Sequence, residues 1–408
     1  MRSGADPARG VGAGYGGTVT VDATPHRGLL APTTLGVDDA APENDPRRLA
    51  VRRFLAAHPS PGGAELAEAG LVAPHWPPPW GLGADPEHQL VIDDELRRAG
   101  VARPVNPIGI GWAGPTILAA GTEAQRARWL PGILSGEEFW CQLFSEPDAG
   151  SDLVSLATRA RREGDHWVVS GQKTWTSYAH LAKWGILLAR TGQPGPRGIT
   201  YFVCPMDAPG VSVRPLVDMT GDHAFNEVFL DEVVLADDLR LGEVDDGWRL
   251  AKVTLANERV ALSGEGVLWG RGPTARDLVE LVTREGLALG AGERDALVRA
   301  VIHGEVLRLL RGRITHAALS GASSGATASV RKALADDHGQ EVMGLAVRLA
   351  HAAGMLADRG PGGVGGEEGV SWAWGFLYAQ ALTIGGGTSV VQRNIIAERV
   401  LGLPREPA

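Results

Sequence analysis

Apolar residues recur with two different periods along the chain, and each change of period marks a boundary. Over residues 44–140 they recur every three to four positions, the spacing of amphipathic helices. In this segment Thr122 and Gln125 form a capping box that starts one helix. Residues 141–241 contain short runs of β-branched and aromatic residues separated by turn formers, and these predict a compact antiparallel barrel or sandwich. Helical periodicity returns over residues 242–408, whose long amphipathic runs are typical of a helical bundle.

The pattern therefore predicts an α+β multidomain fold, and composition narrows its possible functions. The 408 residues carry 39 Lys and Arg against 48 Asp and Glu, a net charge of −9 that leaves no basic footprint for nucleic-acid binding. Two cysteines cannot build a disulfide framework or a thiolate zinc site, and the eleven histidines never adopt the His-Glu-x-x-His spacing, so we expect no metal site. No apolar run is long enough for a membrane span, and a cytoplasmic location is expected. Residues 1–43 lack sustained periodicity and are predicted to be a flexible leader.

Three segments have the composition of ligand-binding loops. The first, Gln142 to Asp152, begins as a strand and runs into a turn whose backbone amides can face a ligand. The second, Gly171 to Ser177, places a tryptophan between hydroxyl side chains, which suits a planar heteroaromatic cofactor. The third, Ile384 to Arg393, joins three glycines to a Thr and a Ser that can cap the next helix. Taken singly, each segment fits a structural role better: a surface turn, a core tryptophan and a helix–helix turn.

Together and in this order, the three segments resemble the acyl-CoA dehydrogenase family, and the likeness extends from about residue 45 to residue 405. The family has a helical N-terminal domain, a middle antiparallel β-domain and a C-terminal four-helix bundle, so the resemblance implies these domains over residues 44–140, 141–241 and 242–408. The chain is most similar to bacterial members with a Gly-Gly-Thr-Ser ending, many of which serve fatty acid or sterol degradation.

The resemblance implies that FAD lies between the β-domain and the bundle, and that an acyl-CoA thioester is oxidised to its 2-enoyl form. The electrons would pass to an electron-transfer flavoprotein or a similar acceptor. The positions that match the family's FAD contacts are Gln142, Phe144, Ser145, Gly150, Ser151, Trp175, Thr176, Ser177, Thr388 and Ser389. The positions that match its substrate contacts are Ser151, Arg259, Gly386 and Gly387.

Dehydrogenation requires a carboxylate that removes the α-proton, held dry and with a pKa raised towards the working pH. Many relatives carry this glutamate immediately before Gly-Thr-Ser, where this chain has Gly386. Glu258, on the first helix after the β-domain, matches an alternative family position for the base. On a helical wheel Glu258 shares a largely apolar face with Ala251 and Leu255, as expected of a carboxylate that is desolvated for a purpose or paired. The alternative is that Glu258 pairs with a nearby arginine and is catalytically idle.

The chain departs from the family pattern in three places. Gln142 replaces an aromatic hydroxyl, Val390 replaces a Glu or Gln, and only Arg331-Lys332 resembles the Arg-Lys-x-Phe-Gly element that contacts FAD in a neighbouring subunit. Gly386, Val390 and the unrecognisable Arg-Lys-x-Phe-Gly element leave open a non-catalytic or half-site subunit of a heteromeric dehydrogenase, whereas Glu258 argues against it. A second alternative is a flavin monooxygenase or oxidase on the same scaffold. The family forms homodimers and homotetramers, and we expect such an assembly or a heteromer here.

Overall fold

The computed structural model describes residues 41–261, 267–268, 272–319, 325–351 and 372–405. For the helical residues 258–261, 312, 315–319 and 325–326 it describes the backbone alone. The predicted leader therefore lies, except for residues 41–43, outside the described residues.

The N-terminal helices form where the 3.6-residue pattern predicts them. Thr122 starts α5 with the predicted capping box: its hydroxyl accepts from the Gln125 amide at 3.2 Å, and the Gln125 side chain accepts from the Thr122 amide at 2.9 Å. The buried side chains Trp129 and Ile133 of α5 belong to the core that this segment shares with the sheet. The elements are α1 (Pro46–Ala57), α2 (Gly63–Glu68), α3 (Pro86–Arg98), the π-helix η1 (Gly109–Ala113), α4 (Gly114–Ala120) and α5 (Glu123–Ser135).

The middle segment is one eight-stranded sheet in the order β6-β7-β3-β2-β4-β5-β8, with β1 paired to β4. The pairing is antiparallel as predicted, except that β1 runs parallel to β4 and a single parallel bridge joins Arg159 to Arg190. A parallel neighbour needs a long crossover, which the chain between β1 and β4 supplies. The strands are β1 (Trp140–Leu143), β2 (Arg159–Glu163), β3 (His166–Ser177), β4 (Trp184–Arg190), β5 (Ile199–Pro205), β6 (Val211–Leu216), β7 (Phe225–Ala236) and β8 (Arg240–Leu241).

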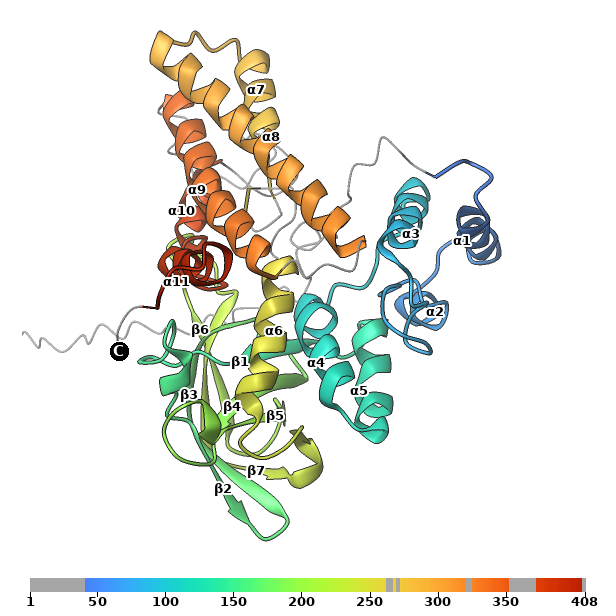
Figure 1. Ribbon diagram of the computed structural model, residues 1–408, viewed down its shortest axis with the longest axis vertical. Helices are drawn as coiled ribbons and strands as arrows, with labels where there is room; N and C mark the ends of the chain where they lie inside the picture. Colours follow the sequence, from blue (N-terminus) through green and yellow to red (C-terminus); the bar gives the residue numbers. More distant parts are fainter. Residues whose placement is uncertain (1–40, 262–266, 269–271, 320–324, 352–371, 406–408) are drawn as a thin grey trace, which may run out of the picture.

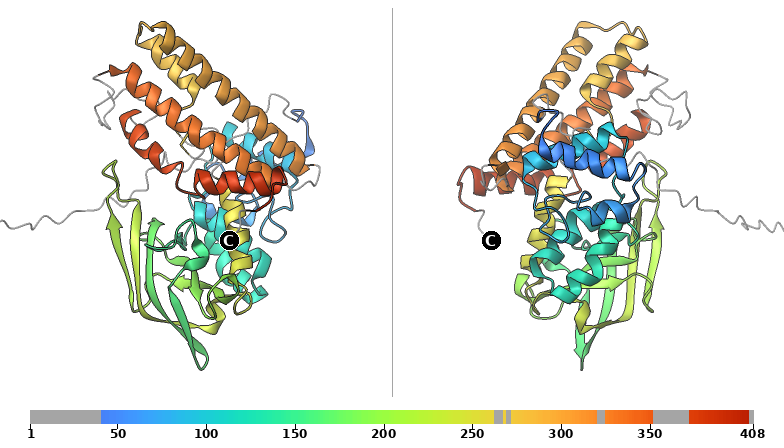
Figure 2. Two further views of the ribbon diagram at one scale, coloured as in Figure 1. Left: turned by 60° about the vertical axis from the view of Figure 1, so that its left-hand side comes forward. Right: turned by 90° about the vertical axis from the view of Figure 1, so that its right-hand side faces the viewer.

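The C-terminal segment is helical and lies at one end of the sheet (Figures 1 and 2). The first helix, α6, starts beside the sheet and leads to the long antiparallel pair α8 and α9, while the N-terminal helices cover one face of the sheet. None of the described helices is both long enough and apolar enough to cross a membrane. The helices are α6 (Gly247–Ala261), α7 (Ala275–Arg284), α8 (Ala291–Leu319), α9 (Gly325–Leu349), α10 (Trp372–Tyr378) and α11 (Ser389–Ile395), followed by the π-helix η7 (Ile396–Val400).

The buried apolar side chains form two separate cores. The larger one joins the N-terminal helices to the sheet and takes in Leu250 and Ala251 from the start of α6. The smaller one, which begins at Val267, lies among the C-terminal helices. Helix α6 therefore begins in the core of the sheet and ends shortly before the core of the bundle begins.

Candidate functional site

The first two ligand-binding segments lie side by side at one end of the sheet. The backbone oxygen of Ser145, just after β1, accepts a hydrogen bond from the Thr174 amide of β3 at 2.9 Å. A buried ion pair holds the same two segments together, because Lys173 Nζ lies 2.7 Å from Glu146 Oε1. The sequence patterns assigned no role to this pair, although both residues stand inside the motifs.

Lys173 is fully buried, and its ammonium has three acceptors: Glu146 Oε1, the Phe144 carbonyl at 3.1 Å and the Leu188 carbonyl at 2.8 Å. Burial lowers the pKa of Lys173 to about 8. Burial alone would raise the pKa of Glu146, but the Lys173 charge lowers it. The Glu146 carboxylate also accepts from the amide of Ala157 at 2.6 Å. The turn of the first segment is thus fixed to β3 by charge-assisted hydrogen bonds.

Trp175 stands at a β-bulge in β3, where the register with β7 shifts between Lys173 and Thr176. Its φ is +56°, a left-handed conformation that is uncommon for a residue with a side chain. The bulge turns the indole outward, so that it is 61% exposed and touches the edge of the Phe225 ring at 5.9 Å between centroids. A core tryptophan was the alternative prediction for this position, and the exposed indole shows that it was wrong. Strained backbone and an exposed aromatic ring together mark a candidate functional position.

Two buried polar atoms of the first two ligand-binding segments have hydrogen-bonding capacity left over. The amide oxygen of Gln142 and the hydroxyl of Thr176 are buried without a hydrogen-bond partner among the described residues. Thr176 is 1% exposed, and its backbone oxygen accepts a hydrogen bond from Nδ2 of the buried Asn226 side chain at 3.0 Å. Because buried polar groups are normally paired, these two atoms fit a ligand that carries its own donors. Ser177, the next residue, is half-buried at the end of β3.

The third segment forms the glycine turn that opens α11. Gly386 and Gly387 have φ angles of +65° and +89°, which only glycine adopts readily. Buried Gln392 donates to both of their carbonyls, at 3.0 and 3.3 Å. Thr388 caps α11 by accepting from the Val391 amide. The Ser389 hydroxyl, like that of Thr176, is buried and unpaired among the residues described.

The third segment and the first two are not joined by a hydrogen bond within the described parts of the chain. One hydrogen bond between the loop after β6 and the C-terminal helices runs from Trp374 Nε1 of α10 to Asp222 Oδ2, at 2.8 Å. The remaining predicted contacts are exposed: a β-carbon at Gly150 would meet open space, and Ser151 beside it lies on the surface. Both belong to the turn fixed by Glu146.

Glu258 and Arg259 lie in the last turn of α6, and their side chains fall outside the described residues. The turn before them is described: Thr254 is fully buried, and its hydroxyl lies 2.8 Å from the Thr116 hydroxyl and 3.0 Å from the Tyr201 hydroxyl. Burial raises the pKa of Tyr201 well above its usual value. Position 258 follows Thr254 by four residues, one helical turn along the same face.

The hydroxyl cluster also reaches the first segment. The Tyr201 ring packs edge-on against Phe144, with 5.8 Å between centroids, and Phe144 is 2% exposed. A continuous set of contacts therefore runs from the first segment through Tyr201 and Thr254 to the helix that carries position 258. Local sequence patterns contain no signal for this cluster, because its members come from α4, β5 and α6.

The Arg331-Lys332 pair lies inside the helical bundle. Both side chains are 3% exposed. Lys332 Nζ lies 2.6 Å from Asp336 Oδ2 one turn along α9 and donates to the Leu382 carbonyl at 3.2 Å. Burial raises the pKa of Asp336 to about 6. Lys332 thus stabilises α9 against the segment before the glycine turn.

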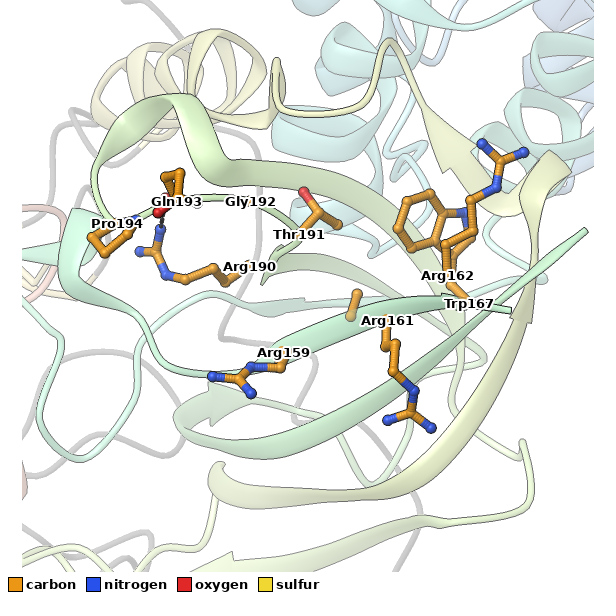
Figure 3. A pocket seen from close by; sticks show the side chains of 10 residues that line it. Arg159, Arg161, Arg162, Trp167, Arg190, Thr191, Gly192, Gln193 and Pro194 are labelled. Carbon is orange, nitrogen blue, oxygen red and sulfur yellow. Dashed lines mark hydrogen bonds between the residues drawn. The ribbon is translucent and has the colours of Figure 1, made fainter. Parts of the chain in front are cut away.

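A second feature of the sheet is an arginine-lined cavity of about 530 Å³ at the end of β2 and β4 (Figure 3). Arg190 is held by backbone oxygens, including that of Val154 at 2.6 Å, and the Arg162 guanidinium lies over the Trp167 ring at 5.7 Å. Arg159 also lines the cavity. Four arginines line this cavity, of which Arg161 pairs with Glu163 at 2.6 Å and Arg190 donates to backbone carbonyls. The arginines are Arg159, Arg161, Arg162 and Arg190.

Comparison with known families gives a match for the N-terminal, the middle and the C-terminal part of the chain. A model described as acyl-CoA dehydrogenase, N-terminal domain matches residues 48–137. The middle-domain model of the same family matches residues 141–233, and its C-terminal-domain model matches residues 245–401.

Two curated relatives come from Mycobacterium tuberculosis. Acyl-CoA dehydrogenase FadE34 is 44% identical over 342 residues, which cover 83% of this chain and 46% of that protein. Acyl-CoA dehydrogenase IpdE1 is 41% identical over 347 residues, which cover 84% of this chain and 87% of that protein. This chain thus spans about half the length of the first relative and most of the second.

Two solved structures share the fold over their whole length. A chain of the Tcur3481-Tcur3483 steroid ACAD superposes with a TM-score of 0.73 at 29% identity, covering 88% of this chain and 97% of that one. A chain of the ChsE4-ChsE5 complex from Mycobacterium tuberculosis superposes with a TM-score of 0.71 at 30% identity, covering 91% of this chain and all of that one.

Proposed function

The chain belongs to the acyl-CoA dehydrogenase family, and we propose that it uses FAD to convert an acyl-CoA thioester to the 2-enoyl-CoA. An electron-transfer flavoprotein is the proposed acceptor of the electrons. The observation that carries the proposal is the exposed indole of Trp175 on its strained bulge, next in the chain to the unpaired hydroxyl of Thr176, together with the unpaired amide oxygen of Gln142 on β1. A planar cofactor with its own hydrogen-bonding edge meets all three requirements.

Bound FAD would supply an acceptor for the hydride that leaves the β-carbon of the substrate. Trp175 would form a wall against its ring system, and Thr176 and Gln142 would offer the hydroxyl and the amide oxygen that lack partners among the described residues. The backbone of Phe144 and Ser145, held by Lys173 and Thr174, would keep the first segment in position. Ser389 at the start of α11 would supply a further hydroxyl.

Glu258 is the proposed base that removes the α-proton. Its position lies one turn beyond Thr254, on the face of α6 that Ala251 and Thr254 bury. A base on this face would be shielded from water, which raises the pKa of a carboxyl group towards neutrality. The glycine turn is poorly suited to carry the base, since Gly386 has a φ of +65°. Arg259 would contact the substrate.

The proposed substrate is a CoA thioester with a bulky, ring-bearing acyl group. CoA carries phosphate groups, and the arginine-lined cavity would offer a guanidinium partner such as Arg159. Gly386 has no side chain, which leaves room at the acyl end. A structural relative at 29% identity is described as a steroid ACAD, and this favours a steroid-derived acyl group here.

Assembly with further subunits is proposed from the surface of α8. Val298, Ile302, Val306 and Leu309 recur at helical spacing along α8 and are 42–56% exposed. An apolar stripe of this length is typical of a subunit interface. The related structures include the ChsE4-ChsE5 complex, so the second candidate function is that of one subunit in a heteromeric dehydrogenase. Lys332 supports this candidate. It matches part of the family element that contacts FAD in a neighbouring subunit, but here it is buried and paired with Asp336 of its own chain.

The test is the visible spectrum of the purified protein before and after anaerobic addition of straight-chain and steroid-derived acyl-CoA thioesters. We expect the oxidised-flavin bands to bleach with a substrate, and Glu258→Gln to retain FAD but lose bleaching. Glu280→Gln, at an exposed helical glutamate of α7, is the matched control and should bleach like the wild type. Bleaching by Glu258→Gln would refute the assignment of the base. A colourless protein that takes up FAD only after co-expression with a second subunit would favour the heteromer, and peroxide release with substrate would indicate an oxidase.

A further inference from the structure

Three side chains of the metal-binding types converge between α8 and α9 in the helical bundle. His303 comes from α8, while His338 and Glu341 come from adjacent turns of α9. One nitrogen or carboxylate oxygen from each lies within 4.8 Å of the other two. The two helices lie side by side in both views (Figures 1 and 2), so the group bridges them.

The contacts within this group leave one nitrogen without a partner. His303 Nδ1 lies 3.1 Å from Glu341 Oε2, and the two imidazole rings are 6.3 Å apart at 78°. His338 is 5% exposed, and its Nδ1 is buried with no hydrogen-bond partner among the described residues. A buried imidazole with an unsatisfied nitrogen is unusual, because such groups normally pair with protein or water.

We propose that His303, His338 and Glu341 bind a divalent transition-metal ion, most favourably Zn²⁺. Two imidazole nitrogens and one carboxylate oxygen are an established zinc ligand set, with a water molecule in the remaining position. Metal–ligand bonds of about 2.0–2.1 Å in tetrahedral geometry require ligand atoms roughly 3.3 Å apart. The His303–Glu341 separation already meets this requirement, and the side chain of His303, which is 53% exposed, is free to adjust and leaves access for water.

A metal at this point would cross-link two neighbouring helices. Of the described α8 side chains, Leu297 and Ala300 are the ones buried in the smaller core. The ion would therefore add a direct bond between α8 and α9, beside the exposed stripe of α8. The sequence predicted no metal site because the spacing from His303 to His338 matches no local motif. This inference is independent of the proposed dehydrogenase activity.

The test is titration of metal-free, full-length protein with Co²⁺ and Zn²⁺. Co²⁺ in a four-coordinate site gives visible d–d absorption, and Zn²⁺ should displace it with one ion per chain. We expect His303→Gln and His338→Gln each to weaken metal binding at least about tenfold. Removing a residue that only hydrogen-bonds to a metal ligand already weakens binding by about this factor, and removing a ligand itself costs more. His166→Gln is the matched control, since His166 also lies beside two carboxylates, those of Asp165 and Glu163, but without a second histidine.

The exposed variant His303→Gln keeps the test valid if replacing buried His338 disturbs folding. Zn²⁺ should also raise the melting temperature of the wild type and of His166→Gln, and should leave that of His303→Gln unchanged. Absence of saturable one-to-one binding, or binding that His303→Gln does not weaken, would overturn the proposal. Equal weakening by His166→Gln would also overturn it, because it would indicate scattered surface binding.

Discussion

Replacing Lys173 with methionine tests whether the buried ion pair holds the candidate flavin site together. The substitution keeps most of the side-chain length but removes an ammonium that has three acceptors. Glu146, which is 7% exposed, then keeps its charge with only amide donors as partners. Breaking a buried pair from one side costs about 3–5 kcal/mol, because it leaves an uncompensated charge. We expect a loss of that size in the free energy of unfolding, together with weaker retention of FAD.

The measurement is urea denaturation at pH 7, followed by circular dichroism and tryptophan fluorescence. Lys183→Met is the matched control: Lys183 pairs with Glu138 at 2.5 Å, but its side chain is 55% exposed. Loss of such a surface pair costs about 0–1 kcal/mol. Adding Glu146→Gln to Lys173→Met should recover part of the lost stability, because no unpaired charge remains buried. Equal losses for Lys173→Met and Lys183→Met would refute the reasoning.

Two further predictions concern the bulge and the bundle. Trp175→Gly should change the free energy of unfolding by no more than about 1 kcal/mol, because relief of the left-handed backbone strain offsets the lost contact with Phe225. The variant should nevertheless lose FAD on gel filtration. Retention of the flavin would contradict the role of the indole. Burial raises the pKa of Asp336 from 3.8 to about 6, so the folded state binds the proton of this carboxyl more tightly than the unfolded state does. The resulting stabilisation is complete below pH 3.8 and is lost as the pH rises through 6. The free energy of unfolding falls by up to about 3 kcal/mol over this range. The unfolding midpoint of the wild type should therefore fall between pH 4.5 and pH 7 by more than that of Asp336→Asn. Equal changes in the two proteins would count against this role of Asp336.

The sequence predicted the elements well where the signal is local. The capping box of Thr122 and Gln125 forms as expected, because both partners lie within one turn. The β-rich middle segment and the helical segments around it are also present. The parallel pairing of β1 with β4 was not predicted, because strand direction depends on the path of a chain that has no periodic signature.

The sequence proposes residues for the candidate site but contains no signal for how they are arranged. Trp175 was assigned to the flavin site by resemblance, whereas its left-handed bulge is set by pairing with β7 across the sheet. Lys173 and Glu146 stand inside the motifs, but their burial emerges only when β1 and β3 meet. The Thr116, Tyr201 and Thr254 cluster draws on three distant parts of the chain. Contacts of this kind depend on tertiary packing, which hydrophobic periodicity does not encode.

The division of the buried side chains into two cores has a thermodynamic consequence for the whole molecule. Because α6 contributes Leu250 and Ala251 to the core of the sheet, the boundary between the two cores falls within or just after this helix. Two cores with little shared apolar contact can melt as separate cooperative units. A ligand that binds across both stabilises each only while the other is folded. Saturation with such a ligand would then merge the separate unfolding transitions of the two cores into one. The width of the thermal unfolding transition would therefore measure the fraction of molecules that hold the ligand.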